Sequence, residues 1–101
     1  MIKVKFLGYN CIVLFDKYNN RRTIMKLVEE NTYEQIAIAT VNIPAEKLEY
    51  DEVCIKDYNE NKGILEALMK AGIISKPRRY IHLGNVEIPI CKLIKWTWKT
   101  F

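Results

Sequence analysis

Apolar and polar residues alternate along most of this chain with the two-residue period of β-strands. In the first segment, Ile2, Val4 and Phe6 alternate with Lys3 and Lys5. Turn-forming Gly, Asn and Pro residues separate this segment from further short apolar stretches. The pattern predicts strands over residues 2–7, 11–15, 23–28, 35–43, 52–56, 79–83 and 86–94.

One segment departs from this alternation and predicts the chain's only helix. Its apolar residues recur at the spacing of one helical face, and they are Ile64, Leu65, Leu68 and Met69. Gly72 follows at a position typical of a helix terminator. We therefore expect a helix over residues 60–71. Because about three turns are marginally stable alone, this helix should dock on the sheet.

The polar residues just before this helix are interpreted as caps rather than as a catalytic cluster. Asp57 stands three residues before Glu60, which is the spacing of a capping box. Asn59 and Asn61 are alternative capping residues.

The elements together predict an α+β fold over one domain, residues 1–101. We expect an antiparallel sheet of about six to seven short strands, which could be strongly curled, with the helix packed on one face. Ala37, Ala39, Val41 and Ile43 share one face of strand 35–43, and its small residues mark it as the face that the helix would cover. Pro44 should end that strand, and Pro89 inside strand 86–94 indicates an edge strand or a bulge.

Composition favours a protein with reduced cysteines. Half of the residues are hydrophobic, which is enough for one core. Cys11, Cys54 and Cys91 are odd in number, far apart and set among apolar neighbours, so we interpret them as core thiols rather than as a disulfide framework. The sequence has no signal-peptide pattern and no apolar run of membrane-spanning length. We expect a cytoplasmic protein without membrane association.

Few residues of the chain could support catalysis. His82 and Ser75 are the only histidine and serine, and no nucleophile motif surrounds Ser75. No cysteine or histidine pair has the spacing of zinc ligands, and no glycine-rich phosphate loop occurs. We predict no enzyme activity, no catalytic residues, no metal and no cofactor.

Charge is segregated along the sequence. Residues 1–28 have a balance of +5, residues 29–60 of −7, residues 61–75 of +1 and residues 76–101 of +5. Such blocks either form opposed basic and acidic faces or mix when the chain folds. The acidic block could be a solvated rim or a surface that attracts a partner's basic groove. Its members are Glu46, Glu49, Asp51, Glu52, Asp57 and Glu60.

Cations and aromatic residues alternate near the C-terminus and in one loop. Such sets grip nucleic-acid phosphates and bases, anchor protein interfaces, or simply cap a core and keep an edge strand soluble. The set comprises Lys76, Arg78, Arg79, Tyr80, Lys92, Lys95, Trp96, Trp98 and Lys99, with Tyr18, Arg21 and Arg22 in the loop.

Several short motifs carry a resemblance to a known family. They are VNIP, DEV-IKDY-EN and ILEAL-KAGI between residues 41 and 73, with IKVKFLGY near the start and VEIPICKL near the end. The chain resembles a family of small uncharacterised proteins of bacteria, bacteriophages and other mobile elements. The resemblance implies no enzyme activity and no catalytic residues. It implies a mobile-element setting, in which small proteins often bind and block a host factor.

We therefore expect a small non-enzymatic binding protein that inhibits or sequesters a host protein, such as a defence component, by stoichiometric binding. Candidate partner-binding residues are Tyr58, Asn59, Asn61, Arg78, Arg79, Tyr80, Trp96 and Trp98. One alternative is a module for single-stranded nucleic acid that uses Arg21, Arg22, Arg78, Arg79, Lys95 and Trp96. The other is an oligomeric sponge for a small nucleotide. The protein is expected to be a monomer or a homodimer, with residues 86–98 as the candidate edge strand.

Overall fold

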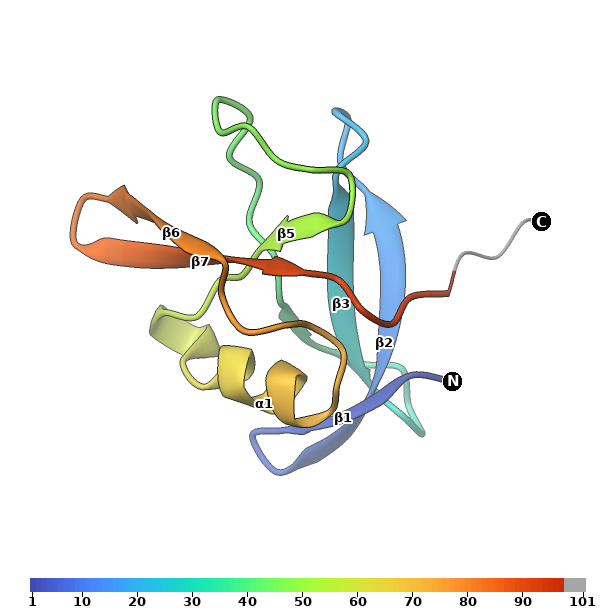
Figure 1. Ribbon diagram of the computed structural model, residues 1–101. Helices are drawn as coiled ribbons and strands as arrows, with labels where there is room; N and C mark the ends of the chain where they lie inside the picture. The colour runs from blue at the N-terminus through green and yellow to red at the C-terminus, as the bar shows by residue number, and fades with distance from the viewer. Residues whose placement is uncertain (98–101) are drawn as a thin grey trace.

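In the described part of the chain, the fold consists of two antiparallel sheets and one α-helix (Figure 1). The computed structural model describes residues 1–97. The first sheet has the order β1-β2-β3-β4, and the second has the order β5-β7-β6. The strands are β1 (Lys3–Phe6), β2 (Tyr9–Lys17), β3 (Thr23–Glu29), β4 (Gln35–Ile38), β5 (Glu52–Cys54), β6 (Arg79–Leu83) and β7 (Val86–Lys92). The helix α1 (Ile64–Lys70) follows a 3₁₀ turn, η1 (Asn59–Asn61). The predicted α+β class is confirmed.

The two sheets are joined where the chain leaves β4. Thr40 forms an antiparallel bridge with Ile55. The Lys56 N–H donates to the Ala39 carbonyl at 2.8 Å, and the Val41 N–H donates to the Cys54 carbonyl at 3.1 Å. The strands therefore follow one another around the molecule, and β1 and β6 are its two outermost strands.

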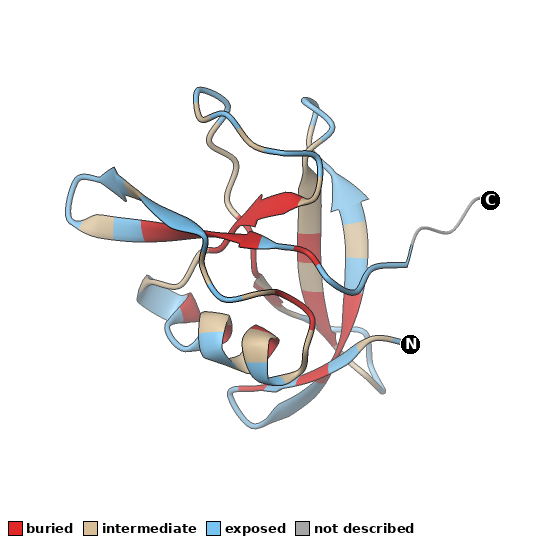
Figure 2. Cartoon of the chain, viewed as in Figure 1, coloured by how far each residue is buried: buried red, intermediate tan, exposed pale blue. Residues whose placement is uncertain are grey.

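The main core lies between the sheets and α1. Met25, Leu27, Ile55, Ile64 and Leu68 are all fully buried in it. Burying side chains of this size contributes about 1.5–3 kcal/mol each. Ala37 and Ala39 belong to the same cluster as the helix residues, whereas Val41 and Ile43, predicted on the same face, belong to a second cluster. The helix therefore shares a core with only the first half of that predicted face. Figure 2 shows the buried positions of α1 turned toward the sheets.

A second, smaller cluster lies on the other face of the second sheet. It is centred on the buried residues Cys54, Ile88 and Ile90. Their chain neighbours Val53 and Cys91 belong to the main core. Because successive side chains of a strand point to opposite faces, this sheet separates the two clusters. The second cluster is completed by partly buried side chains: Val41, Ile43, Leu48, Tyr58, Ile81 and Val86.

The helix begins four residues later than the predicted start at residue 60. Residues Asn59–Asn61 form the 3₁₀ turn, and Gly63 precedes α1 with φ +97°. Asp57 Oδ1 accepts hydrogen bonds of 3.0 Å from the backbone N–H groups of Gly63 and Leu65. The predicted capping box is therefore wrong in one member, because Glu60 pairs with Lys56 instead. The helix is far too short to cross a membrane, and no other helix in residues 1–97 is long and apolar enough to do so.

Two strand predictions also need correction. Regular pairing of the predicted strand 35–43 ends at Ile38, before Pro44 is reached. The strand β7 is central rather than an edge, because it pairs with both β5 and β6. Pro89 is tolerated because its carbonyl faces β5 and accepts from Ile55 N at 3.0 Å. Its nitrogen faces the same side and cannot donate, so one ladder bond is missing, and the Ile55 carbonyl opposite it accepts from the Asp57 N–H at 3.1 Å instead.

Candidate binding surfaces

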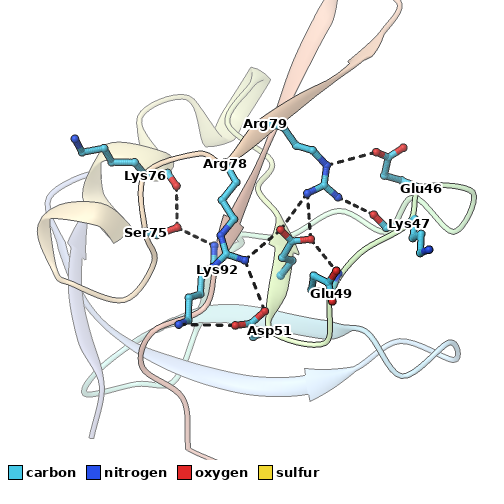
Figure 3. A network of polar contacts seen from close by, with 10 residues as sticks. Glu46, Lys47, Glu49, Asp51, Ser75, Lys76, Arg78, Arg79 and Lys92 are labelled. Carbon is cyan, nitrogen blue, oxygen red and sulfur yellow. Dashed lines mark hydrogen bonds and ion pairs between the residues drawn. The ribbon is translucent and has the colours of Figure 1, made fainter.

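A buried carboxylate organises the base of the β6–β7 hairpin (Figure 3). Glu52 on β5 has a side chain only 2% exposed. Its oxygens accept from Arg79 Nη1 at 3.0 and 3.2 Å, from Arg78 Nη1 at 3.3 Å and from the Glu49 N–H at 2.9 Å. Burial acts to raise the pKa of the Glu52 carboxyl, but these hydrogen bonds outweigh burial and lower the pKa below its ordinary value. Glu52 is therefore a charged anchor.

The two arginines are committed to this anchor rather than free for a ligand. Arg79 also donates to the Lys47 carbonyl at 2.7 Å and lies 3.9 Å from Glu46 Oε1. Arg78 Nη1 lies 3.9 Å from Asp51 Oδ1. The acidic stretch of 46–52 and the C-terminal basic block thus neutralise one another at this point, as expected when charge blocks mix on folding.

Two of the other basic residues predicted for nucleic-acid binding donate to backbone carbonyls of the protein. Arg22 donates to the carbonyls of Ile43 and Glu46, which ties the β2–β3 loop to the connector after β4. Lys95 donates to the Ala71 carbonyl at 3.3 Å. Arg21 is exposed and makes no ion pair with any residue from 1 to 97. Arg22 and Lys95 are therefore bonded within the protein, and Arg22 and Arg79 both contact Glu46.

The turn of residues 58–61 is held from both ends. Asn61 is 2% exposed, and its Nδ2 donates to the Ile38 carbonyl at 2.6 Å. Lys56 forms an ion pair with Glu60 and lies 5.7 Å from the centroid of the Tyr58 ring. Asn61 is therefore a structural residue, whereas Tyr58 is only partly buried and Asn59 is exposed.

A surface hollow of about 500 Å³ lies beside this turn. Its polar groups are largely fixed by bonds within the protein: Tyr18 Oη lies 3.1 Å from Thr40 Oγ1 and Asn42 accepts from Asn20. Chain segments far apart in sequence converge here. Its lining comprises Tyr18, Gln35, Ile36, Ala37, Ile38, Thr40, Val41, Asn42, Lys56, Tyr58, Glu60 and Asn61. We name this hollow the β4 groove.

The sequence marked Tyr58 and Asn61 in the β4 groove but missed Gln35, Ile36 and Asn42. All three lie within the predicted strand 35–43, where they were assigned only structural roles. The exposed Gln35 at the start of an otherwise apolar strand is the one signal that could have drawn attention to them.

A second hollow, of about 700 Å³, lies between the β1–β2 hairpin and α1. Lys3, Lys5 and Lys70 line it together with Glu30. Lys3 pairs with Glu30 at 3.4 Å, whereas Lys5 and Lys70 make no ion pair within residues 1–97. This hollow carries net positive charge.

The predicted aromatic residues of the C-terminal part lie apart from these hollows. Tyr80 on β6 is 50% exposed, and Trp96 is 42% exposed beside Tyr50. The hairpin that carries Tyr80 extends away from the body of the molecule (Figure 1). Trp98 lies outside the described residues.

The residues with possible reactivity are three buried thiols and one exposed histidine. All three cysteines are free and buried, as predicted from their apolar neighbours. Burial raises the pKa of Cys11 and Cys54, and it raises the pKa of Cys91 to about 12. His82 is exposed on β6, with Nδ1 3.5 Å from Glu87. Within residues 1–97, no three potential ligands among His, Cys, Asp and Glu are placed to hold a metal ion.

Comparison with known proteins gives no match to a family model, to a curated protein or to a solved structure.

Proposed function

We propose that the protein is a small non-enzymatic binding protein that inhibits or sequesters a protein partner stoichiometrically, and that the β4 groove receives a side chain of that partner. The observation that carries this proposal is the hollow of about 500 Å³ beside the turn of residues 58–61, which Tyr18 and Tyr58 line. The mobile-element setting and a host defence component as the partner rest on the sequence resemblance alone.

The composition of the β4 groove supports this assignment. Tyrosines in partly buried pockets concentrate binding energy at protein interfaces. Tyr18 and Tyr58 are both partly buried, so each retains an accessible surface. The hydrogen bonds of Asn61 and Asp57 hold the turn in one conformation before binding. Pre-organisation of this kind lowers the entropic cost of association.

The proposal is tested by capturing a partner with matched variants. Tagged wild-type protein, Gln35→Arg and Asn85→Arg are incubated with lysate of the cells that encode the protein, with and without nuclease, and bound proteins are identified by mass spectrometry. Gln35→Arg places a long cation in the groove, whereas Asn85→Arg adds the same charge at the tip of the β6–β7 hairpin.

We expect one protein to be captured by wild type and Asn85→Arg in the presence of nuclease, and to be lost with Gln35→Arg. The purified complex should have a fixed stoichiometry by light scattering. Equal capture by Gln35→Arg, or capture that nuclease abolishes, would contradict the proposal.

A small nucleotide ligand is the second candidate, because Lys5 and Lys70 line the hollow of about 700 Å³ and make no ion pair with any described residue. This volume is in the range of small-molecule sites. Calorimetric titration with nucleoside triphosphates should then detect binding that Lys5→Gln and Lys70→Gln weaken at least tenfold. Absence of heat at millimolar nucleotide would reject this candidate.

The nucleic-acid alternative has less support. Arg22, Arg78 and Arg79 are engaged within the protein, as described above. Binding through the remaining cations would fall steeply with added salt. Salt-insensitive binding, or none, counts against it.

A further inference from the structure

The two outermost strands differ in how they are protected from pairing with another chain. An edge strand carries unpaired backbone donors and acceptors, and proteins commonly block such edges with lysines or cover them. The edge strand β1 has exposed Lys3 and Lys5, and α1 packs against it. The edge strand β6 has neither lysine nor proline. It is also part of the hairpin that extends from the body (Figure 1).

The register of the hairpin shows which backbone groups of β6 face outward. Leu83 pairs with Val86 across the two-residue turn of Gly84 and Asn85, so these two exchange hydrogen bonds. Hydrogen-bonded pairs alternate along an antiparallel ladder, so Arg79 and Ile81 also face β7. The N–H and C=O groups of Tyr80 and His82 therefore point away from the sheet.

These two outward-facing residues fit a second copy of β6 in one antiparallel register. With Ile81 on the two-fold axis, Tyr80 lies opposite His82 of the other copy, and His82 lies opposite its Tyr80. All the outward-facing residues of both copies then form hydrogen-bonded pairs. With the axis on Tyr80, His82 would lie opposite Arg78 of the other copy. With the axis on His82, Tyr80 would lie opposite its Gly84. The Arg78 N–H is not free to pair with a second copy, because it already donates to the Ile90 carbonyl at 2.8 Å.

The side chains are compatible with this register. Ile81 would contact Ile81 of the second copy, and Tyr80 would lie beside its His82. Ile81 is a partly buried member of the second cluster, and Leu83 on the same face is 46% exposed. Pairing would therefore join the second clusters of two copies into one apolar layer. The buried apolar surface would stabilise the dimer, because two strands paired by backbone hydrogen bonds alone are only marginally stable in water.

We propose that the protein forms a symmetric homodimer through antiparallel pairing of β6 with β6 of a second copy, centred on Ile81. The pairing residues Tyr80, Ile81 and His82 do not line the β4 groove, although Val41 and Tyr58 belong to both the groove and the second cluster. The proposal does not depend on the function assigned to that groove.

The first test measures oligomeric state by sedimentation equilibrium in wild type, His82→Pro and Lys5→Pro. His82→Pro removes the backbone N–H of residue 82, which faces solvent in the monomer and would donate to the second copy in the dimer. Proline is tolerated at such edge positions. Lys5→Pro is the matched control, because it removes an outward-facing donor from the other edge strand. Circular dichroism verifies that each variant is folded. We expect dimers for wild type and Lys5→Pro, and at least tenfold weaker association for His82→Pro.

A second test does not depend on the proline variants. The proposed axis brings the two Ile81 Cα atoms to about 4.5–5.5 Å, which suits a disulfide. Ile81→Cys with oxidised glutathione should give a covalent dimer. Leu83→Cys should not, because these residues would be about 13 Å apart in the same dimer. The native cysteines do not interfere, since all are buried.

The proposal is overturned if wild-type protein sediments as a monomer at every concentration measured. Equal crosslinking of Ile81→Cys and Leu83→Cys also overturns it. If Gln35→Arg no longer captures the partner but still forms the dimer, then β6 pairing and partner binding use different residues.

Discussion

Arg79 Nη1 lies 3.0 Å from Oε2 of Glu52, and the two residues are 27 positions apart in the sequence. This pair links β6 to β5, which are not neighbours in the sheet because β7 lies between them. The contact therefore spans the full width of the second sheet. It fixes the base of the hairpin that carries Tyr80.

We predict that Glu52→Gln destabilises the protein by about 3 kcal/mol at pH 7, because it leaves two arginines without their buried counter-charge. The pKa of Glu52 is lower in the folded chain than its ordinary value of 4.5. Its contribution is therefore fully present above about pH 4.5 and is lost as pH falls through the lower, folded pKa. Urea denaturation at pH 3 to 7 should show a smaller acid-dependent loss of stability in Glu52→Gln than in wild type.

Glu66→Gln is the matched control for this prediction. Glu66 is exposed on α1, and its replacement should change the unfolding free energy by no more than about 0.5 kcal/mol. If Glu52→Gln behaves like Glu66→Gln, the buried pair is not an anchor.

The elements of the fold were predictable where they depend on local pattern. The stripe from Ile64 to Met69 correctly predicted the helix, and Gly84-Asn85 correctly marked the closing hairpin. The order of strands was not predictable, because it depends on pairing between distant segments. Pro89 suggested an edge strand, but β7 is central, because the Ile55 carbonyl opposite Pro89 accepts from the Asp57 N–H instead of from a ladder donor.

The candidate site was predictable only in part, for the same reason. Glu52 was indistinguishable from its acidic neighbours, since the arginines that neutralise it are 26 and 27 residues away. Asn61 was interpreted as a cap, whereas its amide is buried against a carbonyl 23 residues earlier. Neither long-range contact leaves a periodic signal in the sequence.

Asn61 provides the second prediction. Asn61→Ala removes the donor to the Ile38 carbonyl and should cost about 2 kcal/mol in unfolding free energy. Asn61→Asp should cost more at pH 7, because a carboxylate would face that carbonyl. Its defect should decrease at pH 4, where a protonated acid can donate. Denaturant titration at both pH values checks this, with the exposed Asn59→Asp as a control that should show no such pH dependence.

The buried thiols provide the third prediction. With the pKa of Cys91 raised to about 12, its thiolate fraction at pH 8 is about one in ten thousand. Ellman's reagent should therefore label native protein far more slowly than unfolded protein. The variant Asn85→Cys, with its new thiol at the exposed hairpin tip, should add one rapidly labelled group. Rapid labelling of wild type without denaturant would show that the cysteines are accessible.

The turn at Gly63 provides the fourth prediction. Gly63 has φ +97°, which is unfavourable for residues with a Cβ, yet no atom lies within 4 Å of the position a Cβ would take. Gly63→Ala should therefore destabilise the protein by about 1 kcal/mol through backbone strain alone.

Thermal unfolding with Lys62→Ala as the control measures this strain, because Lys62 is an exposed neighbour with negative φ. Since Gly63 N–H donates to Asp57, strain here should also loosen the turn that borders the β4 groove.

Hydrogen exchange of the Gly63 and Leu65 amides should accelerate together in Asp57→Ala, which removes the oxygen that accepts from both. Unchanged exchange in that variant would show that Asp57 does not hold the turn.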